Sequence, residues 1–164
     1  FLKSSSFLHE FNYEVFELRD FINSVLQKYK VDFDTKGIFL DFSVPKTMVN
    51  SNQTLLLQVL TNLISNAISF VPDDGTGEIK VHSFSKGNYL TIEIINNGPS
   101  IPEEVIEKIW KPFFKEDDSR SRKYGGTGLG LAIVQGILEK LNCDCGVVNT
   151  ENGVKFWFDV EKSL

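Results

Sequence analysis

The sequence has few cysteines, no long apolar segment and no internal repeats. Cys143 and Cys145 are the only cysteines among 164 residues. If they lie two residues apart in a strand, their side chains share a face and would not easily form a disulfide. We therefore expect two reduced thiols. No run of about 18 apolar residues is present, which predicts no membrane-spanning segment. The formal charge of −5 argues against a general nucleic-acid-binding protein.

The composition is that of one globular domain with a well-filled core. Hydrophobic residues make up 41% and charged residues 24% of the chain, and 14 residues are phenylalanine. Residues 1–12 lack periodicity, and we expect them to be the remnant of a linker from an upstream dimerisation domain. Residues 13–164 are expected to form one domain, cut from a longer protein because Phe1 is no initiator.

Helical and strand patterns alternate along the domain. They predict helices over 18–29, 55–70 and 129–141 and a short helix with Pro102 at its first position; strands are predicted near 13–17, 38–44, 78–84, 89–95, 145–150 and 154–160. Residues 111–127 are expected to form a long loop. Three hairpin-like pairings favour a mixed sheet with helices on one face.

The predicted helix over 55–70 is amphipathic and uncharged. No charged residue occurs between Lys46 and Asp73. Its polar stripe consists of Gln58, Asn62, Ser65, Asn66 and Ser69. A solvated face normally carries Lys and Glu, so a ligand covering the stripe is favoured over plain solvation. Asn62 and Asn66, one turn apart, can present carbonyl oxygens to a hard cation.

Glycines are concentrated where the last predicted helix begins, in GGTGLGLAIV over 125–134. Each costs a helix about 1 kcal/mol relative to alanine, whereas bare backbone at a helix start suits a phosphate. Neither the Walker nor the dinucleotide-binding pattern is present. A hinge without a ligand is the alternative. The preceding basic residues favour a mobile lid that faces phosphate, although they could simply solvate a loop; they are Lys108, Lys111, Lys115, Arg120, Arg122 and Lys123.

Four motifs that carry these features follow one another along the chain. Residues 60–67 (LTNLISNA) resemble an N box, 96–102 (NNGPSIP) a G1 box, 109–114 (IWKPFF) an F box and 126–131 (GTGLGL) a G2 box. In this order they resemble the catalytic and ATP-binding domain of a bacterial two-component sensor histidine kinase, of the gyrase/histidine-kinase/MutL (GHKL) superfamily. The resemblance covers about residues 13–160. It implies an α+β fold: a two-layer sandwich whose mixed, mostly antiparallel sheet of about five strands packs on three helices.

The resemblance also implies a nucleotide site. Asn62 and Asn66 would be the catalytic pair, with Asn66 coordinating the Mg²⁺ that bridges the ATP phosphates. Asn96 would meet the adenine amino group, and Gly98 would let the base lie close. The full ATP-binding set that it implies is Asn62, Asn66, Asn96, Gly98, Ser100, Ile101, Lys115, Arg120, Arg122, Gly126, Thr127, Gly128, Leu129 and Gly130.

Four positions depart from the usual family pattern. Ser69 stands where lysine is frequent, Ser100 replaces a glycine and Trp110 replaces a phenylalanine. Asn96 stands where aspartate is usual. Its amide can accept from the adenine amino group and can also donate towards N1, so adenine binding is expected to survive.

Superfamily members that hydrolyse ATP have a glutamate one turn before the metal-binding asparagine, where this chain has Asn62. An amide cannot act as a base, so hydrolysis is disfavoured. By resemblance, the γ-phosphoryl group passes to a histidine on the protein's own dimerisation domain, then to a response regulator. That histidine is absent here, because neither His9 nor His82 lies in an acceptor motif. The parent is expected to be a homodimeric phosphoprotein anchored in the membrane, with this domain in the cytoplasm and no nucleic-acid partner.

Two other interpretations stay open. A degenerate domain that binds ATP weakly or not at all could act through protein contacts, favoured by Ser69, Asn96 and Ser100. A GHKL kinase acting on serine is the other, although the sequence around Trp110 and the basic stretch over 119–122 resemble sensor kinases more closely.

Overall fold

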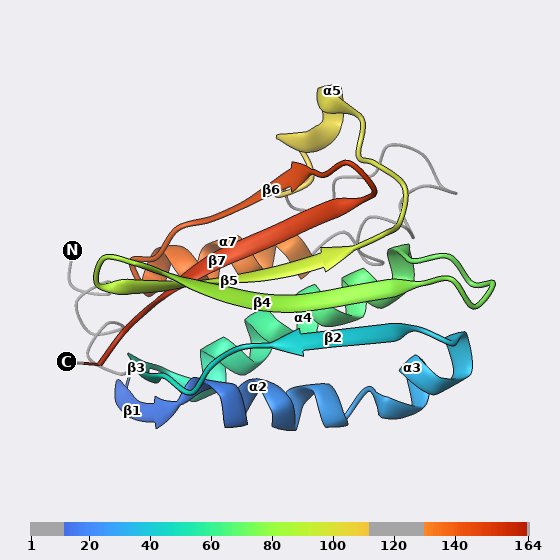
Figure 1. Cartoon of the computed structure of the whole chain (residues 1–164). Helices are drawn as coiled ribbons and strands as arrows, with labels where there is room; N and C mark the ends of the chain where they lie inside the picture. Colours follow the sequence, from blue (N-terminus) through green and yellow to red (C-terminus); the bar gives the residue numbers. More distant parts are fainter. Residues whose placement is uncertain (1–11, 112–129, 164) are drawn as a thin grey trace.

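The computed structural model describes residues 12–111 and 130–163, and every structural statement below concerns this part of the chain. Five strands form one sheet in the order β2-β4-β5-β7-β6 (Figure 1). They are β2 (Phe39–Ser43), β4 (Glu78–Lys86), β5 (Tyr89–Asn96), β6 (Cys145–Asn149) and β7 (Val154–Glu161). Only β2 and β4 pair in parallel. The mixed, mostly antiparallel sheet is therefore confirmed.

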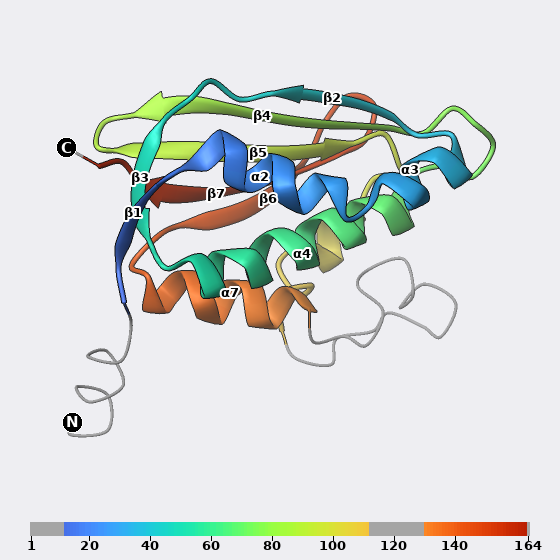
Figure 2. The same cartoon turned by 90° about the horizontal axis from the view of Figure 1, so that it is seen from below.

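Three helices cover one face of this sheet: α2 (Leu18–Gln27), α4 (Gln53–Phe70) and α7 (Gly130–Lys140) (Figure 2). Helix α4 lies between α2 and α7 and contacts both. Strand residues alternate accordingly: Ile92 and Ile94 are fully buried towards the helices, whereas Glu93, opposite Trp157 in the register, lies on the open face. The predicted two-layer sandwich and its three helices are confirmed.

Smaller elements complete the described part. Strands β1 (Glu14–Glu17) and β3 (Met48–Ser51) pair antiparallel in a separate two-stranded sheet. The strand expected near residue 13 is thus present, but outside the main sheet. Helix α3 (Lys30–Lys36), which was not predicted, ends at Gly37 with φ of 66°. In α5 (Glu103–Ile106), Pro102 is the N-cap rather than the first helical residue, which corrects the prediction.

An aromatic chain joins the layers near one end of the sheet. The ring of Phe156 on β7 lies 6.4 Å from that of Phe70 at the end of α4. Trp110 meets the same ring edge-on, at 6.0 Å and 81°. This arrangement adds to plain area burial and fixes the segment after α5 against the core. Trp110 is therefore part of the packing.

The open face of the sheet carries the second tryptophan. The ring of Trp157 lies so close to Gly146 that a Cβ there would come within 2.6 Å of the indole nitrogen. Lys86 Nζ lies 5.2 Å from the ring centroid and 2.8 Å from Asp159 Oδ2. A cation over an indole face is attracted by the ring quadrupole. Trp157 is thus held flat on the side of the sheet away from the helices.

Both cysteines are free thiols, as predicted. Burial, reinforced by nearby carboxylates, raises the pKa of Cys143 and that of Cys145 to about 11. Such thiols are mostly protonated at neutral pH and are poor nucleophiles. Within the described ranges, no helix has both the length and the apolar character needed to cross a bilayer.

Candidate functional site

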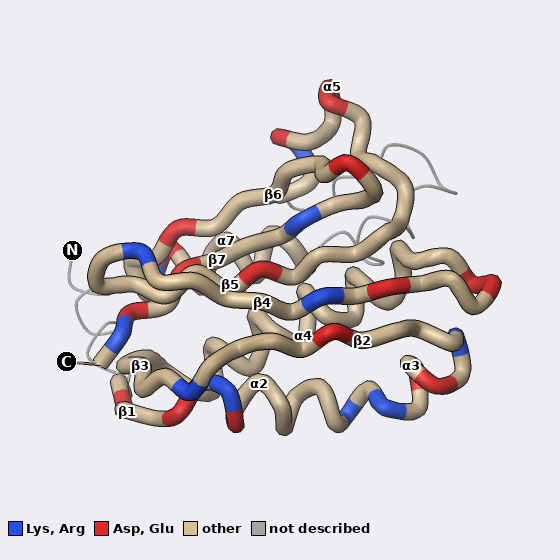
Figure 3. The backbone as a smooth tube through the Cα atoms, viewed as in Figure 1, with Lys and Arg blue, Asp and Glu red and all other residues tan. Residues whose placement is uncertain are grey.

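Helix α4 forms one wall of the candidate site. The Asn52 side chain caps its start by accepting from Leu55 N–H at 2.8 Å, and extended backbone at Val71, just before a proline, ends it. The tube of α4 shows no charged residue along its length (Figure 3). The polar stripe divides by burial: Gln58, Ser65 and Ser69 are exposed, Asn62 is half-buried and Asn66 is buried. Only its asparagines therefore approach the interior.

Asn66 is 5% exposed, and neither its Oδ1 nor its Nδ2 has a hydrogen-bond partner in the described part of the chain. A buried amide left unpaired costs a folded protein about 1–3 kcal/mol, so it needs a partner from outside these residues. An amide oxygen suits Mg²⁺, which keeps few protein ligands and completes its shell with phosphates and water. No group of three or more His, Cys, Asp or Glu able to hold a metal occurs among the described residues.

Asn62 lies one turn before Asn66 and next to α7. A Cβ added at Gly130 would lie 3.4 Å from Asn62 Oδ1, so the first described turn of α7 packs on this amide. This places the N box asparagine beside the last glycine of the G2 box. The sequence resemblance predicts the same neighbourhood.

The other end of α4 meets the end of β5. A Cβ at Gly98 would lie 2.4 Å from the Phe70 carbonyl oxygen, a contact that only glycine allows. Gly98 N–H donates to Asn96 Oδ1 at 2.8 Å. Asn96 is 1% exposed, and its Nδ2 has no partner among the described residues. A second buried amide is thus left partly unpaired.

These positions form an elongated strip. Asn62, Asn66 and Phe70 are spaced four residues apart on one face of α4, a length of about 12 Å. One end of the strip meets α7 at Gly130, and the other meets Gly98. The structure therefore brings together Asn62, Asn66, Asn96, Gly98 and Gly130 from the predicted site.

The loop over 97–101 is held by a residue that sequence reasoning missed. Ile101 N–H donates to Asn149 Oδ1, and Asn149 Nδ2 donates to the Ile101 carbonyl, both at 2.8 Å. Ile101 is 1% exposed, whereas Ser100 is exposed, so their predicted ligand roles stay predictions. Asn149 is an asparagine at a strand end like many others. No signal in the single sequence marked it.

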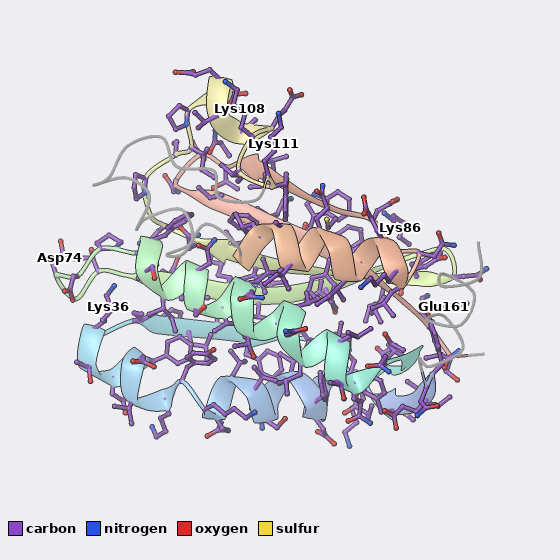
Figure 4. All side chains as sticks on the ribbon, turned by 180° about the vertical axis from the view of Figure 1, so that it is seen from behind. Lys36, Asp74, Lys86, Lys108, Lys111 and Glu161 are labelled. Atoms are coloured by element: carbon purple, nitrogen blue, oxygen red, sulfur yellow. The ribbon has the colours of Figure 1, made fainter. Side chains whose placement is uncertain are left out.

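A lysine that was not predicted lies at the end of α4. Lys36 Nζ donates to the Ile68 carbonyl at 2.7 Å, and Figure 4 shows Lys36 near Asp74 at this end of the helix. A cation at a helix C-terminus is stabilised by the helix dipole. Ser69 stands where lysine is frequent in the family pattern, and its Oγ donates to the Ser65 carbonyl at 3.1 Å. Two lysines of the predicted basic stretch, Lys108 and Lys111, lie near α5 (Figure 4).

The remaining predicted ligands and the predicted lid lie outside the described residues. They are Lys115, Arg120, Arg122, Gly126, Thr127, Gly128 and Leu129, together with residues 112–127 of the predicted loop and residues 1–11 of the predicted linker.

The family model described as histidine kinase-, DNA gyrase B-, and HSP90-like ATPase matches residues 51–164. Sensor protein VanSB of Enterococcus faecalis is 35% identical over 113 residues, which is 69% of this chain and 25% of that protein. Sensor protein kinase WalK of Staphylococcus aureus is 33% identical over 142 residues, 81% of this chain and 32% of that protein. The chain thus spans about a quarter to a third of these two relatives.

Solved structures resemble the whole described fold. The catalytic domain of histidine kinase ThkA superposes with a TM-score of 0.81 at 32% identity, covering 93% of this chain and 99% of that one. Histidine kinase ThkA in complex with the response regulator protein TrrA superposes with a TM-score of 0.74 at 28% identity. The match covers 92% of this chain and 42% of that one. Full-length ShkA in complex with AMPPNP superposes with a TM-score of 0.80. At 22% identity, this match shows a similar fold and nothing more.

Proposed function

Because the chain belongs to the family of histidine kinase-, DNA gyrase B-, and HSP90-like ATPases and is a catalytic domain of the histidine kinase type, we propose that it binds Mg-ATP and transfers the γ-phosphoryl group to a histidine on a separate domain of the same protein. The observation that carries this proposal is the buried Asn66 of the uncharged helix α4, whose Oδ1 and Nδ2 have no partner among residues 12–111 and 130–163.

Asn66 would hold Mg²⁺ through its Oδ1, with the phosphates supplying further oxygens. When bound, the cation would neutralise charge on the triphosphate. The Asn62 amide would donate to the phosphates next to α7, where bare backbone at Gly130 leaves room. The adenine base would lie at the opposite end of the strip, over Gly98 and against Asn96.

Asn62 also favours transfer over hydrolysis. It lies one turn before Asn66 and contacts α7, where a water-activating base would be needed. A neutral amide can orient a group by hydrogen bonds but cannot take a proton from water. A neutral imidazole is already nucleophilic, so the domain has mainly to position the phosphoryl group.

The acceptor histidine would lie on a dimerisation domain, and the phosphoryl group would continue to a response regulator. Histidine kinase ThkA, which this chain resembles, has been solved in complex with such a regulator. The relatives VanSB and WalK are sensor proteins of which the match covers 25% and 32%. We therefore propose a homodimeric, membrane-anchored and phosphorylated parent protein, with this domain on the cytoplasmic side.

Calorimetric titration with a nonhydrolysable ATP analogue, with and without Mg²⁺, tests the proposal. Binding that requires Mg²⁺ and is lost in Asn66→Ala supports it. Absence of any metal-dependent binding contradicts it and favours the degenerate interaction module. Labelled ATP added to the full-length parent then tests transfer: acid-labile, alkali-stable label on the protein is expected, whereas release of free phosphate alone would indicate a hydrolase.

A further inference from the structure

The orientation of the Asn96 amide is fixed by its neighbour. Gly98 N–H is a donor and lies 2.8 Å from Asn96 Oδ1. If the amide were turned over, its NH₂ group would face another N–H group, which is unfavourable. Oδ1 is therefore already bonded to the backbone, and the group without a partner in the described part of the chain is the donor Nδ2.

Among the residues that the structure describes, no buried carboxylate lies next to this donor. The buried polar residues in the described ranges are Ser51, Asn66, Thr91, Asn96 and Asp159. The one acid among them, Asp159, accepts from Thr91 Oγ1 at 2.7 Å and pairs with Lys86 at 2.8 Å. Thr91 is five positions from Asn96 in β5, so its side chain lies on the opposite face of the sheet. Asp159, which bonds to Thr91, therefore does not lie beside Asn96.

A free amide donor discriminates poorly between two kinds of purine. Adenine presents an amino donor at position 6, whereas a six-oxopurine presents an acceptor there. If the base keeps the position in which atom 6 faces residue 96, an aspartate, which only accepts, would repel the oxo group. Asn96 Nδ2 can donate either to adenine N1 or to a purine O6, and Oδ1 keeps one lone pair for an amino group. Neither base leaves a buried charge unpaired against this side chain.

Resting on the nucleotide-binding function proposed above, we propose that Asn96 makes the base site accept six-oxopurine nucleoside triphosphates with an affinity within about tenfold of that for ATP. Sites that recognise one polar group strictly reject the wrong analogue by several orders of magnitude. Asn96 is a specificity-determining residue in this proposal. It would widen the nucleotide range of the domain.

The experiment compares the affinities of ATP and inosine triphosphate by calorimetry in Mg²⁺, for the wild type and two variants. Asn96→Asp replaces the donor by an acceptor, which Gly98 N–H still satisfies. Asn97→Asp is the matched control, because it adds the same charge one residue away, where the amide contacts Glu78 N–H and the Thr76 carbonyl instead. We expect a wild-type ratio within about tenfold, a ratio at least tenfold more in favour of ATP for Asn96→Asp, and an unchanged ratio for Asn97→Asp.

A wild-type preference for ATP of more than tenfold overturns the inference but leaves the proposed function intact. An unchanged ratio in Asn96→Asp also overturns it. If Asn96→Asp does not fold, the wild-type ratio decides by itself. Failure of the wild type to bind either nucleotide in Mg²⁺ contradicts the proposed function and this inference with it.

Discussion

Two pairs of asparagines in this domain differ in how their amides are used. In Asn97 and in Asn149, both the amide oxygen and the amide nitrogen form hydrogen bonds with backbone groups, each 2.8 Å long. Asn66 and Asn96 are more deeply buried, yet three of their four polar atoms have no partner among the described residues. The amides of the first pair therefore hold a loop in place, whereas those of the second pair are available to a ligand. We expect removal of the first kind to lower stability and removal of the second kind to lower nucleotide affinity.

The largest effect is expected at Gly98, which follows Asn97 in the chain and bonds to Asn96 Oδ1. Alanine at this position would place Cβ 2.4 Å from the Phe70 carbonyl oxygen and 2.9 Å from Asn96 Oδ1. Because both neighbours are held in the core, we expect Gly98→Ala to lower the free energy of unfolding by about 3 kcal/mol. Urea titration measures the change.

Gly136→Ala is the matched control for Gly98→Ala. It lies in α7, and a Cβ there would meet no atom of the described residues within 4 Å. Alanine is the better helix former, so this variant should gain up to about 1 kcal/mol. Equal stability of the two variants would contradict the close contact at Gly98.

Asn66→Ala separates binding from stability. Loss of the amide should weaken Mg-ATP binding about 100-fold, the usual value of a hydrogen bond or ligand contact to a charged group. The free energy of unfolding should fall by no more than about 1 kcal/mol, because the two polar atoms removed make no bond in the described structure. Calorimetry and urea titration on one sample check both quantities. A loss of stability with unchanged affinity would show that Asn66 is a structural residue.

Asn149→Ala is the converse experiment. It leaves the buried backbone groups of Ile101 without their partners, so we expect a loss of about 2 kcal/mol in the free energy of unfolding. Nucleotide affinity should fall less than in Asn66→Ala, because the loop is disturbed while the α4 amides stay in place. A larger loss of affinity than in Asn66→Ala would make Asn149 part of the binding set.

The effect that is smallest near neutral pH concerns two thiols away from both asparagine pairs. Burial and nearby carboxylates raise the pKa of Cys143 and that of Cys145 from 9.0 to about 11. Between these values the folded protein keeps protons that the unfolded chain releases, so the free energy of unfolding should fall as pH rises from 9 to 11. Urea titrations should show a shallower fall for the double variant Cys143→Ala/Cys145→Ala. Equal slopes would contradict the pKa shifts.

The sequence predicted the main sheet and the long helices because each combines a clear apolar period with a marked end. Helix α3 lacked such a signal, since seven residues with Phe33 as the one buried member are too short to show a helical period. Strand β3 has four residues and shows no alternation long enough to recognise. Short elements of this kind are specified by tertiary contacts.

The candidate site was predictable in its residue types but less so in its connections. The lack of charge in α4 and the glycine at 98 pointed to Asn66 and the end of β5. The partners of Asn149 and Lys36 were not predictable, because each pairs with backbone far along the chain: Ile101 for one and Ile68 for the other. A backbone carbonyl leaves no trace in residue identity. Which side-chain atoms stay unpaired is likewise a property of the folded molecule.

The separation of the two tryptophans has a practical use. Trp110 touches the Phe156 ring that also meets α4, whereas Trp157 lies on the open face under Lys86. These are the only two indoles in the chain. A Trp157→Phe protein would therefore contain a single intrinsic fluorophore next to the strip, and its emission would report nucleotide occupancy without any attached dye.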